Sequence, residues 1–262
     1  MRSGKPVAVF AVLLVVSFAT MNAMPSDTLL AALLQEAVLA LVALVAVGLA
    51  VPDALKRCTQ TVQQRSIVRF TAITLLLVGL VGGAITLLAW LFAGGGTMAC
   101  FASTALPSTA DLMENLLLLL GICLLTGLYE ESFMRVLGIE AFERALDTKR
   151  TILASAALFA LLHVGAPDVS AGRLVLLQTA LKFGQALLFG VILGALYVRT
   201  RRLWPCALIH AGFDVLYMAP NVLLTGTMPE TYASGAVGDT VLLAVSVLML
   251  AGIVLKIRKE IA

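Results

Sequence analysis

The sequence predicts an all-α fold: a polytopic transmembrane helical bundle of about eight spans, with both termini on the cytoplasmic side. Three observations lead to this prediction. Hydrophobic residues make up 61% of the 262 residues and charged residues only 13%, whereas a soluble domain carries about 25% charged residues. Apolar runs of spanning length recur along the whole chain. The basic residues gather in every second connection between these runs.

Each predicted span is an apolar run close to the roughly 20 residues that cross a bilayer. Two of the runs are short for a full crossing, the first and the fifth. In chain order the runs lie at 6–22, 28–51, 70–93, 112–134, 151–166, 174–198, 203–224 and 239–255. The connections between them are too short for a soluble domain, so we predict that residues 1–262 form a single integral-membrane domain.

The distribution of basic residues fixes the predicted orientation. The connections around 23–27, 94–111, 167–173 and 225–238 carry a single basic residue, Arg173. Most other Lys and Arg residues lie in the remaining connections and at the two ends: Arg2, Lys5, Lys56, Arg57, Arg65, Arg69, Arg144, Lys149, Arg150, Arg199, Arg201, Arg202, Lys256, Arg258 and Lys259. The positive-inside rule places this second set in the cytoplasm. An even number of spans then fits every connection.

The first predicted span has two interpretations. Arg2 and Lys5 precede a short apolar run, 7–19, and Ala23 ends a stretch of small residues, which also describes a secretory signal peptide. Cleavage near Ala23 would leave seven spans in the same orientation. We favour a retained span, because this run passes quickly into the next one.

The four cysteines lie on different predicted loops and spans. They are Cys58, Cys100, Cys123 and Cys206. Their spacing matches neither a metal-binding pattern nor a disulfide framework. We therefore interpret them as small apolar packing residues.

Several ionisable residues lie within or at the end of apolar runs. They include both histidines of the chain, His163 and His210, and its adjacent glutamates, Glu130 and Glu131. A bilayer penalises such groups by about 2.5–3.5 kcal/mol each on insertion scales, so they usually mark function. We expect them to meet in one pocket in the cytoplasmic half or the middle of the bilayer. Such a pocket would hold the acid and imidazole groups that activate water.

Helix geometry predicts different roles for the two glutamates. Adjacent side chains point about 100° apart on a helix. Glu131 and Arg135 are four residues apart on one face, which favours an ion pair that fixes the rotation of the helix. Glu130 is then free to face another helix as a general base. The alternative is that both glutamates only end a span at the membrane interface.

Each histidine has a neighbour one helical turn away on the same face. Phe159 shares a face with His163, and Asp214 shares a face with His210. The Asp214 carboxylate can accept a hydrogen bond from one nitrogen of His210 and so orient the ring. The alternative is that both pairs are structural, a packed histidine and a hydrogen bond between spans.

Two further charges, Glu36 and Lys182, lie inside predicted spans at similar depth. We predict a buried ion pair between them, with Gln178 and Gln185 close by. Two roles stay open for this pair. It pins two spans together, or Lys182 holds a carboxylate of a substrate.

The motifs, taken together and in this order, resemble the signature of the CPBP intramembrane metalloproteases. This family includes the type II CAAX prenyl endopeptidases and the Abi or bacteriocin-processing proteins. The motifs are Glu130-Glu131-x-x-x-Arg135, Phe159-x-x-x-His163 and His210-x-x-x-Asp214. The resemblance covers about residues 112–216, which it implies to be the catalytic core.

This resemblance implies an all-helical membrane protease that hydrolyses a peptide bond. Glu130 would activate the water, and His163 would assist it. His210 would stabilise the oxyanion, and Glu131 would be tied to Arg135. Together with Asp214, the two histidines and two glutamates form the expected catalytic set, supported by Arg135 and Phe159.

The last motif departs from the family pattern, because Asp214 stands where many members have asparagine. An ionised aspartate cannot donate a hydrogen bond to an oxyanion. Two roles stay open for Asp214. Its carboxylate orients His210, or it is protonated in its apolar setting.

The resemblance also raises the question of a metal. Glu130, His163 and His210 could ligate a catalytic zinc ion and leave one position for water. These ligands would come from three helices, and the chain has no HExxH pair on one helix. We favour water activated by Glu130 without a tightly bound metal, and zinc stays the alternative.

The leading functional hypothesis is an intramembrane endopeptidase acting on a membrane-associated protein or peptide, with prenylated proteins as one option. The alternative is a non-enzymatic membrane immunity or peptide-binding factor. A third hypothesis is a transporter with a proton relay, although the sequence shows no internal repeat. The expected partners are the substrate and the lipid bilayer, with no nucleic acid, and the expected location is a bacterial plasma membrane.

Overall fold

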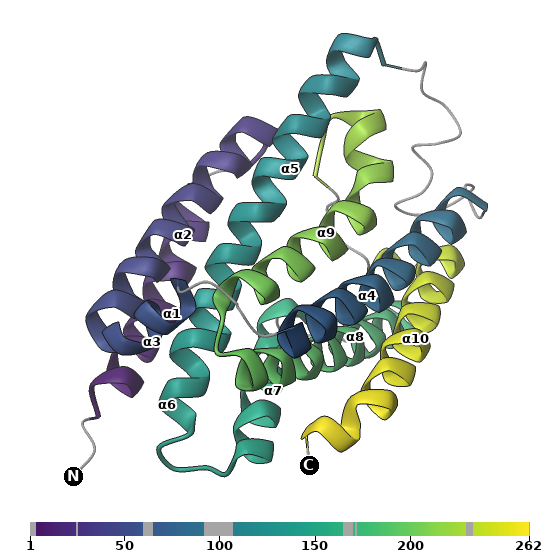
Figure 1. The fold of residues 1–262 in the computed structure, drawn as a ribbon. Helices are drawn as coiled ribbons and strands as arrows, with labels where there is room; N and C mark the ends of the chain where they lie inside the picture. Colours follow the sequence, from purple (N-terminus) through teal and green to yellow (C-terminus); the bar gives the residue numbers. More distant parts are fainter. Residues whose placement is uncertain are drawn as a thin grey trace.

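The computed structural model describes residues 4–24, 26–59, 65–91, 107–164, 170, 172–228 and 233–261. These residues form a bundle of helices, and none of them lies in a β-strand (Figure 1). The helices are α1 (Lys5–Ala23), α2 (Leu29–Ala50), α3 (Pro52–Thr59), α4 (Arg65–Leu91), α5 (Thr109–Glu131), the π-helical segment η2 (Ser132–Ile139), α6 (Glu140–Phe142), α7 (Thr148–Val164), α8 (Arg173–Thr200), α9 (Leu203–Thr225) and α10 (Val237–Ile261). The predicted all-α fold is confirmed.

In the described part of the chain, six helices are long and apolar enough to cross a membrane. They are α1, α2, α5 with its continuation to Phe142, α8, α9, and α10 as far as Ile257. Helices also form at the predicted spans 70–93 and 151–166, as α4 and α7. Within the described residues, however, the apolar stretch of α4 is Ala72–Ala84, and α7 has only 17 residues. The chain is thus a multi-pass membrane protein, while eight spans and their orientation stay predictions.

Helices from distant parts of the sequence pack side by side. α5 packs against both α2 and α9, and α8 packs against both α7 and α10. Figure 1 shows α5 running along the length of the bundle, with α1 and α2 on one side of it and α9 on the other. α7 also packs against η2, which continues α5. The three helices that carry the sequence motifs, α5, α7 and α9, therefore belong to one packed unit.

Three connections that we predicted on one side of the membrane meet at one end of the bundle. Arg57 of α3 contacts Glu140 of α6 at 2.7 Å. Arg201, which follows α8, contacts Glu140 at 3.4 Å and Glu143 at 2.7 Å. These ion pairs join the basic connections to the end of the α5–η2–α6 helix, as expected if all three connections lie on the same side of the membrane.

The helix that carries the glutamate pair, α5, begins with a capping box and continues into a π-helical segment. At its start, the Ser108 hydroxyl accepts from the Asp111 backbone N–H, and the Asp111 carboxylate accepts from the Ser108 N–H, both at 3.2 Å. At its end, the chain continues as η2 rather than stopping near residue 134 as predicted. Every residue of η2 is buried. A π-helical stretch is rare and often marks a functional site.

The described cysteines behave as packing residues. Cys58, Cys123 and Cys206 are buried and unpaired, in agreement with the prediction. Burial raises the pKa of the Cys58 thiol, in the short helix α3, above its ordinary value. Cys100 lies outside the described residues.

A glycine sets the distance between α5 and α9. A Cβ atom at Gly127 would lie 2.6 Å from the Ala207 carbonyl oxygen, which is too close for any side chain. Gly127 stands one turn before Glu131, so the close contact also determines how near Glu131 comes to α9. We expect Gly127→Ala to lower the free energy of unfolding by about 1–3 kcal/mol and to reduce activity by displacing Glu131.

Thermal unfolding in detergent would measure this loss of stability. Gly252 of α10 is a matched control, because no other helix in the described part of the chain comes within 4 Å of a Cβ built there. Gly252→Ala should be neutral or stabilising, by up to about 1 kcal/mol. Equal stability of the two variants would contradict the role that we assign to the α5–α9 contact.

Candidate active site

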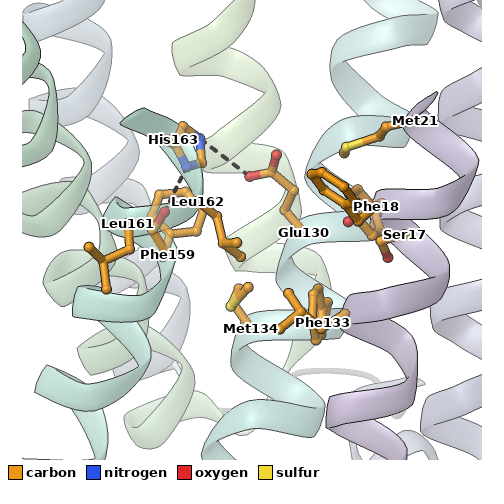
Figure 2. A pocket seen from close by; sticks show the side chains of 12 residues that line it. Ser17, Phe18, Met21, Glu130, Phe133, Met134, Phe159, Leu161, Leu162 and His163 are labelled. Carbon is orange, nitrogen blue, oxygen red and sulfur yellow. Dashed lines mark hydrogen bonds and ion pairs between the residues drawn. The ribbon is translucent and has the colours of Figure 1, made fainter. Parts of the chain in front are cut away.

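Glu130 lies where three helices meet. From α5 its Oε2 atom is 3.7 Å from Nε2 of His163 on α7 and 3.6 Å from Nε2 of His210 on α9. Figure 2 shows the Glu130 carboxylate pointing at the His163 ring. Oε2 is buried and has no hydrogen-bond partner among the described residues. The structure therefore brings together the acid and both imidazoles, as predicted, and leaves an unused acceptor between them.

His163 is held by its own helix. Its Nδ1 atom lies 2.9 Å from the backbone carbonyl oxygen of Phe159. A carbonyl oxygen only accepts, so Nδ1 carries a proton and donates it. In the neutral ring, Nε2 is then an acceptor that faces Glu130. The rings of Phe159 and His163 lie 4.2 Å apart, which confirms the shared helix face.

His210 is almost fully buried and faces a carboxylate on both sides. Its Nδ1 atom lies 2.9 Å from Oε1 of Glu131. Its Nε2 atom lies 3.4 Å from Oδ2 of Asp214 and 3.6 Å from Oε2 of Glu130. Asp214 contacts this ring, as the four-residue spacing predicts, and the shorter contact comes from Glu131. The two adjacent glutamates thus face opposite nitrogens of one ring.

Glu131 is in turn held by a fully buried arginine. Arg135 Nε lies 3.1 Å from Oε2 of Glu131, and both side chains are inaccessible to solvent. This is the ion pair that the four-residue spacing predicted. The guanidinium also lies 4.7 Å above the Phe159 ring. One carboxylate thereby links Arg135 to His210.

Sequence reasoning missed Ser155, which anchors this arginine from α7. Its hydroxyl accepts from Arg135 Nη1 at 3.3 Å and donates to the Met134 carbonyl oxygen at 2.9 Å. Ser155 therefore fixes both the guanidinium and the backbone of η2. The available signal was a small polar residue one turn before Phe159, on the face of α7 that carries the motif.

Two cavities meet at Glu130 and His163. The first has a volume of about 410 Å³ and an almost entirely apolar lining. Figure 2 shows it between Phe18 and Met21 of α1 on one side and Leu161 and Leu162 of α7 on the other. The second cavity measures about 280 Å³ and is lined by most of the polar groups of the site, among them Gln35, Glu36, Thr126, Lys182, His210 and Asp214.

Glu36 and Lys182 both line this polar cavity. The Lys182 ammonium donates to Oε1 of Gln185 at 3.0 Å and lies 5.4 Å from the Tyr217 ring. Gln185 is thus close to Lys182, as predicted. Gln178 stands one turn before Lys182 on α8 and binds the backbone of Gly235 and Ala236 before α10. A direct contact between Glu36 and Lys182 stays a prediction.

The described residues do not group into a metal site. No three or more of their His, Cys, Asp and Glu side chains are arranged to hold one ion. Nδ1 of both histidines is bound to an oxygen atom, which leaves Nε2 of each ring facing Glu130. If zinc binds, Glu130, His163 and His210 are the residues that would hold it.

The region that carries this site also matches a known family. Residues 112–216 match the family described as Type II CAAX prenyl endopeptidase Rce1-like. This part of the chain is similar to the Rce1-like family. The match begins in α5 and ends in α9, so the Rce1-like region contains all three motifs and omits α1 to α4 and α10. No curated protein matches the chain.

The match over residues 112–216 bears on the class of the protein. The matched family is described as one of CAAX prenyl endopeptidases. An endopeptidase is therefore supported at the family level, in agreement with the resemblance of the three motifs.

Proposed function

We propose that this protein is an intramembrane endopeptidase that hydrolyses a peptide bond with water activated by Glu130. One observation carries the proposal. A buried carboxylate oxygen of Glu130, which has no hydrogen-bond partner in the described part of the chain, lies within 3.7 Å of Nε2 of two histidines from two other helices. General acid–base catalysis requires such groups within reach of one water molecule. The site lies between two cavities, so a substrate chain can pass through it.

The first step is deprotonation of water. A water molecule within hydrogen-bond distance of Glu130 and His163 can donate to the carboxylate and to the free Nε2 of the imidazole. Glu130 takes one proton as the water oxygen bonds to the peptide carbonyl carbon. When the C–N bond breaks, Glu130 returns this proton to the leaving amine. The proton balance therefore closes without a tightly bound metal.

His210 is suited to stabilise the negative charge that forms on the carbonyl oxygen. Its Nδ1 proton is held by Glu131 at 2.9 Å, which fixes the orientation of the ring. A proton on Nε2 then points toward Glu130, where the substrate carbonyl would lie. A preorganised donor of this kind contributes about 10²–10³-fold to turnover.

The shape of the site favours a hydrophobic substrate that enters from the membrane. Phe18 of α1 and Leu161 of α7 line the apolar cavity and are 70% and 57% exposed. In a multi-pass protein such faces contact lipid. We infer that a membrane-associated protein or peptide places its apolar part here, and a prenylated CAAX protein is the first class to test.

Comparative mass spectrometry of membrane peptides would test the proposal. Membranes containing wild-type protein would be compared with membranes containing Glu130→Gln, which keeps the size of the side chain but removes the base. We expect at least one membrane peptide to be cut only in the wild-type sample. A farnesylated, internally quenched peptide ending in a CAAX sequence would be assayed in parallel.

The two arms of this experiment separate the hypotheses. Identical peptide profiles, with both proteins folded, would contradict proteolysis and favour the peptide-binding factor. Cleavage of native peptides without cleavage of the farnesylated reporter would keep the protease and exclude the prenylated substrate.

A further inference from the structure

The polar cavity contains an ammonium group among carboxylates. Its lining includes Lys182 together with the acids Glu36, Glu130 and Asp214. Lys182 and Asp214 come from helices that pack against each other, α8 and α9. The proposed reaction already uses Glu130, whereas it uses neither Lys182 nor Asp214.

Asp214 creates an electrostatic problem for that reaction. Its carboxylate lies 3.4 Å from Nε2 of His210, the nitrogen that also faces Glu130 at 3.6 Å. An ionised carboxylate only accepts hydrogen bonds. Because the ionised Asp214 carboxylate is negatively charged and cannot donate, it would repel the negative oxygen that forms beside His210. A nearby positive charge is needed to offset this repulsion.

Lys182 is held where it can supply that charge. Its Nζ atom donates to Gln185 Oε1 at 3.0 Å, and the Tyr217 ring lies 5.4 Å away. Gln185 is itself anchored, because its Nε2 atom donates to the buried Ser246 hydroxyl of α10 at 2.7 Å. Residues from α8, α9 and α10 thus fix the ammonium beside the polar cavity.

We propose that Lys182 is the counter-charge of Asp214 in the active site, so that the two residues work as one electrostatic unit beside His210. This inference rests on the proposed proteolytic function. It makes Lys182 a positioning residue that allows His210 to face a developing oxyanion. An amide at position 214 is neutral and can donate, so it would remove the need for the lysine.

A mutant cycle tests this dependence. The variants are Lys182→Met, Asp214→Asn, the double variant Lys182→Met/Asp214→Asn, and Lys182→Met/Glu36→Gln. We expect Lys182→Met to lower turnover of the farnesylated reporter about 10²-fold and Tm by about 5–10 °C, because it leaves a buried acid without its counter-charge. Adding Asp214→Asn should restore turnover to within about tenfold of Asp214→Asn alone, and restore most of the Tm.

Controls separate charge from other effects of the substitution. Lys182→Arg keeps the positive charge and should retain more activity than Lys182→Met. Lys149→Met removes an exposed lysine at the start of α7 and should behave as wild type. The reporter would be assayed both as the free C-terminal acid and as the C-terminal amide.

Two results would overturn the proposal. Rescue by Glu36→Gln but not by Asp214→Asn would show that Lys182 pairs with Glu36 to join two helices. A loss of activity confined to the free-acid reporter would show that Lys182 binds the substrate carboxylate. If wild-type protein does not cut the reporter, the prenyl-peptide activity fails, while the Tm cycle still decides between Asp214 and Glu36.

Discussion

Replacing Glu131 with glutamine is expected to lower turnover about 10²–10³-fold while the protein remains folded. The Glu131 carboxylate lies between two donors, Arg135 at 3.1 Å and Nδ1 of His210 at 2.9 Å. A glutamine at position 131 must turn its oxygen toward the guanidinium, which cannot accept. Its NH₂ group then faces Nδ1, so His210 can no longer carry a proton on both nitrogens. The charged donor to the oxyanion would be lost.

Steady-state kinetics with a cleaved peptide would measure this effect. The loss should fall mainly on kcat, because Glu131 acts on a group that contacts the transition state. Glu114→Gln is the matched control, since Glu114 is an exposed residue of the same helix. Wild-type turnover in the Glu131→Gln enzyme would show that Glu131 does not orient His210.

The largest effect on stability is expected for Arg135→Met. This change leaves the Glu131 carboxylate inaccessible to solvent and without its cation. Breaking a buried ion pair in this way costs about 3–5 kcal/mol. It also removes the donor to Ser155 and the cation above Phe159. We expect a fall in Tm of roughly 5–15 °C.

A second substitution separates the electrostatic cost from the loss of packing. The double variant Arg135→Met/Glu131→Gln carries no buried unpaired charge, so it should regain a large part of the lost Tm, with turnover remaining low. Arg150→Met is the control, because Arg150 is largely exposed and its ion pair with the neighbouring Asp147 lies at the surface. If the double variant were no more stable than Arg135→Met, the ion pair would not be the source of the effect.

The sequence alone predicted which groups must meet. Acids and imidazoles in apolar helices have few partners except one another, so Glu130, His163 and His210 were expected in a single pocket. Helical periodicity also predicted the contact of Glu131 with Arg135 and the shared face of Phe159 and His163. The last two relations are local, within one turn of a helix, whereas the first joins three helices, and the structure contains all of them.

The tertiary structure decided how these groups pair. Helical spacing suggested that Asp214 orients His210, yet Glu131 from another helix makes the 2.9 Å contact. This contact depends on the close approach of α5 to α9 at Gly127. The anchor at Ser155, the π-helical segment and the two cavities likewise depend on how separate helices lie against one another. The period of 3.6 residues fixes which side chains share a face, whereas the rotation and depth of one helix against another depend on packing between distant parts of the chain.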